Sequence, residues 1–254
     1  MRFASLGSGS QGNALVVEAG RTRLMLDCGF GINESAARLA RLGLEPRDLD
    51  AIVVTHEHDD HIGGVTRFAR KYELPVYLTY GTLTALNGER AAVVEITLID
   101  SHTPFAVGDI EVQPYPVPHD AREPAQFVFS DGRASLGVLT DAGASTPHIV
   151  AMLSGLAALV LECNHDSGML ANGSYPPSLK RRIASRLGHL ANDAAAQLLA
   201  SLDCSRLQHL IAAHLSQQNN RPELARAAMA DAIGCAPDWV GIATQDEGFG
   251  WRNI

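Results

Sequence analysis

The sequence contains no apolar run that approaches the ~20 consecutive residues needed to cross a membrane. It also has no Pro-, Gly- or Ser-rich linker, no block of like charges and no low-complexity segment that would divide the chain. The first residues lack the apolar core and the small-residue cleavage site of a secretion signal. We therefore expect a cytoplasmic protein with no membrane segment, folded as a single α/β domain over residues 1–254.

Cysteine pairs and an excess of positive charge are absent as well. The four cysteines form no C-x-x-C pair and lie among apolar neighbours, which favours buried thiols over disulfides. The net charge of −8 excludes a global basic field, so any polyanionic substrate has to be held locally. Hydrophobic residues make up 46% and charged residues 19% of the chain, a composition that supports a sizeable core.

Histidines and carboxylates are concentrated in the segment Thr55–His61, with the sequence Thr-His-Glu-His-Asp-Asp-His. It follows the apolar run Ala51–Val54, which predicts a buried strand, and precedes Ile62–Val65, where a helical pattern begins. Side chains alternate along an extended segment, so His56 and His58 are expected to face one pocket. Imidazole and carboxylate groups are ligands for divalent transition metals. A histidine-rich surface loop is the alternative, but such loops rarely follow a buried strand directly.

A second group of polar residues follows other expected strands. Asp60 and His61 lie where the chain begins to coil, and we expect them to turn toward a second metal beside the first. His119, Asp141 and His214 each lie at the exit of an expected strand, and prolines stiffen the approach to His119. Taken alone, His119 could be an exposed loop histidine and Asp141 a turn residue, and their position downstream of the motif favours the metal site.

The glycine-rich segment Gly7–Asn13 has the spacing G-x-G-x-x-G of dinucleotide-binding loops. The residues that follow it, Ala14–Glu18, have a strand pattern, whereas a dinucleotide site requires a helix there. We therefore reject a dinucleotide site and interpret the glycines as a sharp turn between two strands. Ser8 and Asn13 remain available as hydrogen-bond donors to a substrate.

The rest of the chain alternates expected strands and helices. Strands over Val94–Ile99, Phe105–Val107 and Ile110–Val117 are expected to form a meander, and Trp239–Ile242 is expected to pair with Phe249–Trp251. Further strands are expected over Arg2–Leu6, Ala14–Glu18, Arg23–Leu26, Pro75–Leu78, Gln126–Ser130, Ala134–Leu139, Ala157–Glu162 and Leu207–Ala213, with helices over Ile32–Leu42, Val65–Tyr72, Thr82–Leu86, Pro147–Leu153, Asp193–Leu202 and Arg221–Ile233. The basic run Lys180-Arg181-Arg182 with Arg186 is typical of a solvated helix face, and contacts to a substrate backbone are the alternative.

The pattern His-x-His-x-Asp-His between an apolar strand and Gly-Gly resembles the signature of the metallo-β-lactamase superfamily. The resemblance implies a four-layer αβ/βα sandwich of two similar halves, with the site along one edge of the facing sheets. It also implies that Asp27 orients the metal-binding loop. The implied ligands are His56, His58 and His119 for one metal and Asp60, His61 and His214 for the other, with Asp141 bridging both.

Within the superfamily, five segments are similar to the compact WalJ/YycJ-type branch, whose members are regarded as DNA exonucleases. These segments are Leu6–Ala14, Pro118–Ala121, Leu161–Asp166, Gly188–Asn192 and His214–Asn220. Asp120 departs from the context after His119 that thioesterases and true lactamases have, and Ala191 replaces a common hydroxyl residue.

The resemblance implies a hydrolase with two divalent ions, Zn²⁺ or Mn²⁺, held ~3.5–4 Å apart. In this hypothesis a metal-bound hydroxide attacks a phosphodiester, and DNA is the preferred substrate. Asp60 would hold metal and orient the hydroxide, and His189 would donate a proton to a phosphate oxygen or the leaving group. The other proposed roles are the orientation of His189 by His165 and Asp166, and substrate contacts by Ser8, Asn13, Asn192 and Asn219.

Two other functions stay open. A small-molecule hydrolase could use the same ions on a lactone, thioester or cyclic phosphodiester, and it would need a closed apolar pocket instead of an open groove. A noncatalytic scaffold would retain the fold, but such proteins usually lose metal ligands. The sequence does not decide between Zn²⁺ and Mn²⁺, between DNA and RNA, or between a monomer and a homodimer. It also leaves the direction of digestion and the pathway open.

Overall fold

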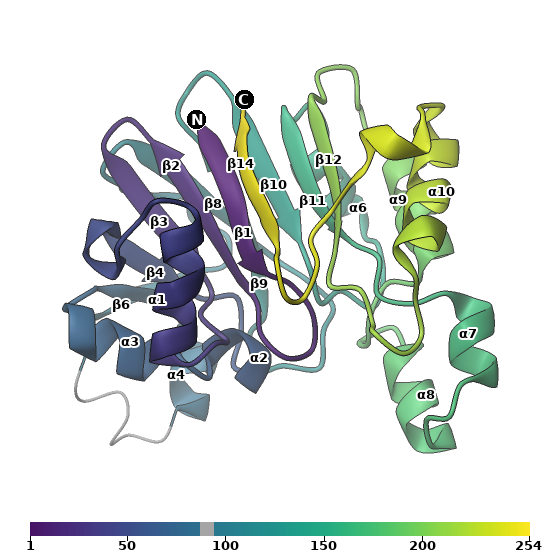
Figure 1. The fold of residues 1–254 in the computed structure, drawn as a ribbon, viewed down its shortest axis with the longest axis horizontal. Coiled ribbons are helices and arrows are strands. Elements are labelled where there is room, and N and C mark those ends of the chain that lie inside the picture. The colour runs from purple at the N-terminus through teal and green to yellow at the C-terminus, as the bar shows by residue number, and fades with distance from the viewer. Residues whose placement is uncertain (87–93) are drawn as a thin grey trace.

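The computed structural model describes residues 1–86 and 94–254, which form two seven-stranded sheets (Figure 1). The first sheet has the strand order β14 (Phe249–Asn253), β1 (Arg2–Gly7), β2 (Ala14–Ala19), β3 (Thr22–Leu26), β4 (Ala51–Val53), β5 (Val76–Thr79) and β6 (Ile96–Ile99). The second sheet has the order β13 (Gly241–Ile242), β12 (His209–Ala213), β11 (Ala158–Glu162), β10 (Ser135–Leu139), β9 (Ala125–Ser130), β8 (Ile110–Pro116) and β7 (Phe105–Val107).

The strand directions follow the same pattern in both sheets. Neighbours are antiparallel from β14 to β3 and from β7 to β10. They are parallel from β3 to β6 and from β10 to β13. Parallel strands end at the same edge of a sheet, so the loops that follow β3, β4, β10, β11 and β12 are brought together there.

Helices cover the outer face of each sheet (Figure 1). The helices of the first half are α1 (Ile32–Arg41), α2 (Asp59–Ile62), α3 (Val65–Tyr72) and α4 (Tyr80–Ala85). Those of the second half are α6 (Pro147–Leu153), α7 (Ser167–Asn172), α8 (Pro177–Ile183), α9 (Asn192–Ala200) and α10 (Pro222–Ile233). The predicted four-layer αβ/βα sandwich is confirmed. Among the described residues, no helix is long and apolar enough to cross a membrane.

Three apolar clusters match the three interfaces of a four-layer sandwich. The central cluster packs the two sheets together through residues such as Phe3, Phe127 and Val160. A second cluster joins the outer face of the second sheet to α6, α9 and α10, and a third joins the first sheet to α1 and α3. The parallel strands β4 and β11 are buried on both faces, which explains why their sequences are continuously apolar until Glu162.

Two expected strand arrangements are wrong. β6 pairs with β5 in the first sheet, whereas β7 and β8 belong to the second, so the expected meander over 94–117 is divided between the sheets. The segments 239–242 and 249–251 do not pair with each other: β13 lies beside β12, and β14 lies beside β1. The separation has a packing reason, because Phe249 on β14 contacts Phe3 in the central core, with ring centroids 5.6 Å apart.

Candidate metal centre

The structure brings three histidines from two loops together at the edge of the sheets. Ligand atoms of His56, His58 and His119 all lie within 4.8 Å of one another. Nδ1 of His56 is 2.9 Å from Thr55 Oγ1, and Nδ1 of His119 is 3.1 Å from the carbonyl oxygen of Gly188. These contacts fix both rings so that each Nε2 is left to face the common centre.

A second group lies beside the first and includes two carboxylates. Asp60 Oδ2 is 3.6 Å from His61 Nε2 and 3.4 Å from His214 Nε2. Asp141 Oδ2 is 3.0 Å from His61 Nε2, and its Oδ1 is 3.5 Å from His214 Nε2 and 3.9 Å from His119 Nε2. Asp141 therefore lies between the two groups of imidazoles, where one carboxylate reaches both.

Unpartnered ligand atoms indicate that the site fits metal ions. In the described part of the chain, the buried side-chain atoms without a hydrogen-bond partner include His56 Nε2, His214 Nε2 and Asp141 Oδ2. A buried polar atom without a partner costs about 1–3 kcal/mol, and native structures keep few of them. Imidazole nitrogen and carboxylate oxygen are the donor atoms that a divalent ion of the zinc type binds.

The pKa values of the ligands divide the site electrostatically. Burial lowers the pKa of His56 and of His119, so both rings are held neutral, the form that binds metal. Burial also acts to lower the pKa of His61 and His214, but Asp141 and neighbouring carboxylates together outweigh it and raise both. Burial acts to raise the pKa of Asp141, and His214 and His61 bring it well below 3.8 instead. The buried carboxylate thus stays ionised and attracts positive charge.

A buried aspartate from the first sheet supports the metal-binding loop. Asp27 accepts hydrogen bonds from the backbone N–H and the hydroxyl of Thr55, and its Oδ2 lies 2.8 Å from His61 Nδ1. A carboxylate on the remote nitrogen of a ligating histidine fixes its tautomer and its orientation. The Nε2 atom of His61 is consequently turned toward Asp60 and Asp141.

The backbone is strained at three of these positions. Asp27, Asp141 and His214 have φ values of 60°, 52° and 56°, in the left-handed region that favours glycine. The other non-glycine residue with such a φ in the described ranges is Glu73, which ends α3. Strain of about 1–3 kcal/mol per residue persists only where the surroundings enforce it. The strained backbone therefore lowers local stability, and it directs these three side chains into the candidate metal site.

Sequence reasoning missed Glu162, the buried last residue of β11. Its Oε1 lies 2.8 Å from His189 Nδ1, and its Oε2 accepts hydrogen bonds from the backbone N–H groups of Ala142 and Leu190. Burial acts to lower the pKa of His189, but the charge and hydrogen bond of Glu162, together with the charges of Asp141 and Asp60, outweigh it and raise the pKa to about 9. A carboxylate that ends an otherwise apolar strand was the signal that could have identified it.

His165 and Asp166 do not occupy the position expected for them. His165 Nδ1 lies 3.2 Å from Asn164 Oδ1, and Asp166 Oδ1 accepts the backbone N–H of Met169 to cap α7. Asp166 thus serves the start of α7, and the carboxylate at His189 Nδ1 is that of Glu162.

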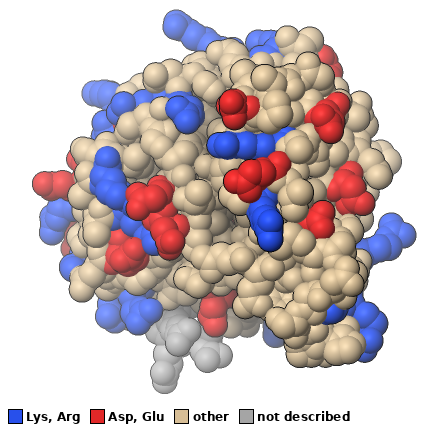
Figure 2. Space-filling model, turned by 45° about the vertical axis from the view of Figure 1, so that its right-hand side comes forward, with Lys and Arg blue, Asp and Glu red and all other residues tan. Residues whose placement is uncertain are grey.

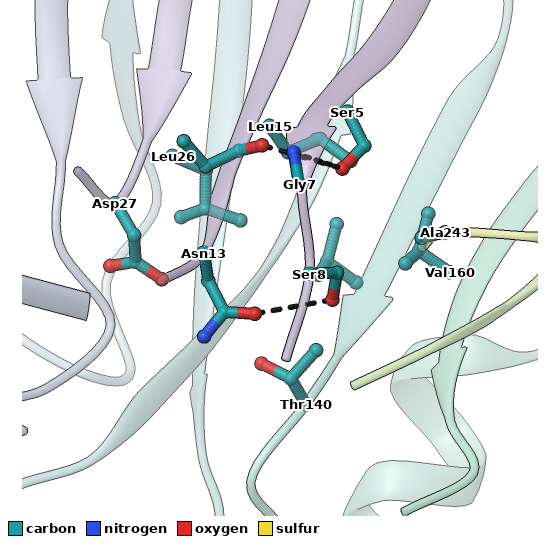
Figure 3. Close-up of a pocket in the computed structure, with 12 residues that line it drawn as sticks. Ser5, Gly7, Ser8, Asn13, Leu15, Leu26, Asp27, Thr140, Val160 and Ala243 are labelled. Atoms are coloured by element: carbon teal, nitrogen blue, oxygen red, sulfur yellow. Dashed lines mark hydrogen bonds between the residues drawn. The ribbon is translucent and has the colours of Figure 1, made fainter. Parts of the chain in front are cut away.

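The four expected substrate contacts are buried and hydrogen-bonded or packed inside the protein. Ser8 Oγ donates to Asn13 Oδ1 (Figure 3). It also accepts the backbone N–H of His214. Asn192 exchanges two hydrogen bonds of 2.9 Å with Asn220, and Asn219 is 2% exposed. Ser8, Asn13 and Asn192 thus hold loops of the site from within, and direct contact of the four residues with a substrate stays a prediction.

An open groove leads to the ligands. A hollow of about 360 Å³ is lined by Asp60, Asp141, His189 and His214, and also by residues from α8 and the loop before it. A second hollow of about 400 Å³ shares Ser10, Asp59 and Asp60 with the first. The two hollows therefore adjoin at these three residues, beside the ligand side chains.

Comparisons with known proteins agree with this fold. The model of the β-lactamase superfamily domain matches residues 22–214. The exodeoxyribonuclease YycJ of Bacillus anthracis is 37% identical over 239 residues, which cover 92% of this chain and 89% of that protein. The exodeoxyribonuclease WalJ of Streptococcus pneumoniae is 34% identical over 245 residues, 95% of this chain and 91% of that protein.

Solved structures show the same architecture at low sequence identity. The crystal structure of Zn(2+)-bound PqqB from Methylobacterium extorquens matches with a TM-score of 0.75 and 17% identity, and the match covers 100% of both chains. At that identity the match shows the fold alone. The chain therefore belongs to the metallo-β-lactamase superfamily and, within it, to the family of the YycJ and WalJ proteins.

Proposed function

We propose that this protein is a metal-dependent phosphodiesterase that digests DNA from an end. The observation that carries the proposal is the pair of ligand groups that share Asp141 beside an open groove. Two relatives named exodeoxyribonucleases support DNA as the substrate. We further infer that residues 1–254 act as one domain, since both sheets supply ligands, and that the protein works in the cytoplasm, where its four free cysteines stay reduced.

The site would hold two divalent ions, Zn²⁺ or Mn²⁺. One would bind His56, His58 and His119, and the other Asp60, His61 and His214, with Asp141 reaching both. When bound, such ions lower the pKa of a water toward ~7 and neutralise charge on phosphate oxygens. The two groups of ligand atoms support the number of ions, and the mixed nitrogen and oxygen donors accept either metal.

The residues around the ligands would position the water and move protons. Asp60, which lines the groove and belongs to the second group, would orient the attacking water through its carboxylate. His189 uses Nδ1 toward Glu162, so Nε2 is the nitrogen that would donate to a phosphate oxygen or to the leaving group. A single aimed donor of this kind contributes about 2.7–4 kcal/mol to the reaction. Glu162 would act as a positioning residue that keeps the ring charged and oriented.

The test is a substrate series with protein reconstituted with Zn²⁺ or Mn²⁺. We expect hydrolysis of bis-p-nitrophenyl phosphate and stepwise shortening of end-labelled single- or double-stranded DNA, with RNA and small lactones or thioesters as comparison substrates. His56→Ala should remove the activity while circular dichroism shows a retained fold. Turnover by metal-free His56→Ala protein would refute the metal assignment, and hydrolysis of lactones or thioesters without any diester would support a small-molecule hydrolase.

The role of His189 has a separate readout. His189→Ala should lower kcat by about 10²–10³-fold with an unchanged metal content measured by elemental analysis. Glu162→Gln should act in the same direction with a smaller effect, because it keeps the shape of the side chain and removes the charge. A loss of metal in parallel with the loss of kcat would make His189 a structural residue.

A further inference from the structure

The second half of the molecule carries an additional segment that the first half lacks. Residues 167–187, which we call the arm, contain α7 and α8 and lie between β11 and α9. The equivalent connection in the first half, between β4 and α3, contains the metal-binding loop and the short helix α2. In Figure 1, α8 extends beyond the edge of the sheets at which the ligand loops lie.

The arm has a charge opposite to that of the whole chain. It contains four cationic residues, Lys180, Arg181, Arg182 and Arg186, and no Asp or Glu, in a protein of net charge −8. Figure 2 brings this side of the molecule forward and shows Lys and Arg scattered among Asp and Glu without a broad field of one sign. Of the four cations of the arm, Arg182 lines the hollow at the ligands.

Arg182 connects the arm to the metal ligands. Its Nε donates a 2.6 Å hydrogen bond to Asp120 Oδ2, and Asp120 Oδ1 lies 3.5 Å from His119 Nε2 and 3.8 Å from His58 Nε2. The hydrogen bond to Asp120 is the main cause that raises the pKa of Arg182, and the charge of Asp60 contributes. Because a guanidinium has five donor hydrogens, the Nε contact leaves donors for a second anion.

Other arm residues line the same groove and hold the arm in place. Tyr175 and Leu179 line the hollow at the ligands together with Arg182, and Tyr175 is partly exposed. Lys180 Nζ donates to the carbonyl oxygen of Ala171 and ties α8 to α7. The backbone N–H of Asp120 donates to the carbonyl oxygen of Leu187, 3.0 Å away.

The far end of the arm is fixed against the loop of Asp141. A Cβ atom on Gly143 would lie 2.4 Å from the carbonyl carbon of Arg186, so the two backbones are in close contact. The C-terminal end of the arm is thus held by the loops of Asp120 and Asp141, and Arg182 is held over the groove by Asp120, which reduces the entropy lost on binding.

We propose that the arm binds a single-stranded segment of nucleic acid, with its cations on successive phosphates and Tyr175 stacked on a base. A positive track beside one aromatic ring is how proteins hold single strands without reading their sequence. Arg182 contacts the phosphate next to the one that is hydrolysed, and Asp120 is the positioning residue that keeps Arg182 over the groove. This inference rests on the proposed function, because it takes the substrate to be DNA.

The test measures binding of a fluorescent, phosphorothioate-linked oligothymidylate to the metal-loaded protein by anisotropy, over a range of salt concentrations. Two variants remove cations from the arm: the triple variant Lys180→Gln/Arg181→Gln/Arg186→Gln and the single variant Arg182→Gln. Each should weaken binding ~10-fold or more and reduce the slope of log Kd against log salt by ~0.7 per lost phosphate contact. Tyr175→Ala should weaken binding ~10-fold at every salt concentration, and Tyr175→Phe should restore it. The matched controls are Arg133→Gln and Arg206→Gln, exposed cations outside the arm.

The outcomes separate this inference from the proposed function. If the wild-type protein digests DNA but the arm variants bind the strand with unchanged Kd and slope, the arm is not the binding element and the proposed function stands. If a DNA duplex binds more tightly than the single strand through the same cations, the single-strand assignment is wrong. If no diester is hydrolysed at all, the proposed function fails, whatever the arm binds.

Discussion

Each half of the molecule places an aspartate in the left-handed conformation after corresponding strands, Asp27 after β3 and Asp141 after β10. A glycine in close backbone contact follows two residues later in both halves, Gly29 in the first and Gly143 in the second. Asp27 points to the remote nitrogen of His61, whereas Asp141 points to the ligand nitrogens themselves. One backbone geometry thus supports a candidate ligand in the first half and supplies a candidate ligand in the second.

The strands that follow these aspartates in the chain order of each sheet, β4 and β11, also differ in the residues that end them. β4 consists of apolar residues and is followed by the loop with His56, whereas β11 ends in the buried Glu162 and is followed by the arm. In the proposed mechanism, most metal ligands come from the first half, and the proton donor and the substrate-binding element come from the second. The two halves thus share one framework, and their loops carry different chemical functions.

The largest expected effect distinguishes the two aspartates. Asp141→Asn removes the charge that both ligand groups share, so we expect loss of bound metal and a fall in diester hydrolysis of about 10³-fold or more. Asp27→Asn removes the support behind His61, and we expect metal affinity to fall by about 10–100-fold, with activity restored at high metal concentration. Metal titration followed by activity measurement checks both. Equal losses in the two variants, neither restored by metal, would break the distinction between support and ligand.

The next effect concerns the paired glycines. A Cβ atom on Gly29 would lie 1.9 Å from the carbonyl oxygen of Asp60, whereas one on Gly31 meets no described atom within 4 Å. We expect Gly29→Ala to lower the free energy of unfolding by about 1–3 kcal/mol and to weaken metal binding, and Gly31→Ala to change it by less than about 0.5 kcal/mol. Gly143→Ala should have a destabilising effect similar to that of Gly29→Ala. It should act on DNA affinity more than on metal affinity, because its close contact is with Arg186 of the arm.

Urea unfolding and metal titration check these glycine variants. If Gly143→Ala released metal as readily as Gly29→Ala did, the two close contacts would serve the same purpose, and the halves would be more alike than the side chains indicate.

The smallest effect concerns surface charge on the first sheet. Burial acts to raise the pKa of Glu18, but its hydrogen bonds with Arg2 and Arg23 bring it below 4.5. The contribution of this carboxylate to stability is therefore complete above pH 4.5 and is lost as the pH falls through the lowered pKa. Glu18→Gln should cost about 0.2–1 kcal/mol at pH 7 and less at pH 3. Denaturant unfolding at both pH values checks this, with Glu111→Gln on the exposed face of β8 as the control.

Much of the fold follows from the sequence because its local patterns are strong. Apolar runs such as Ala51–Val54, together with the turn glycines, place most strands and helices within a few residues of their observed bounds. The motif Thr55–His61 indicates the metal centre because histidine and carboxylate rarely follow a buried strand without a ligand.

Other features depend on contacts between distant segments, which local patterns do not encode. β14 joins β1 from the opposite end of the sequence, and the pairing is decided by the core contact of Phe249. The contacts of Glu162 with His189 and of Arg182 with Asp120 join residues that lie 27 and 62 positions apart. A spacing of that kind carries no periodic signal, so only the folded arrangement identifies the partners.

The left-handed backbone at Asp27, Asp141 and His214 has a consequence for engineering and for molecular evolution. Glycine would relieve the local conformational energy at each position, so a selection for heat resistance alone would drift toward glycine and inactivate the molecule. Thermotolerant variants that retain turnover should therefore gain their stability elsewhere, in the packed layers remote from these three turns. At these three positions, a substitution that increases stability is expected to decrease activity.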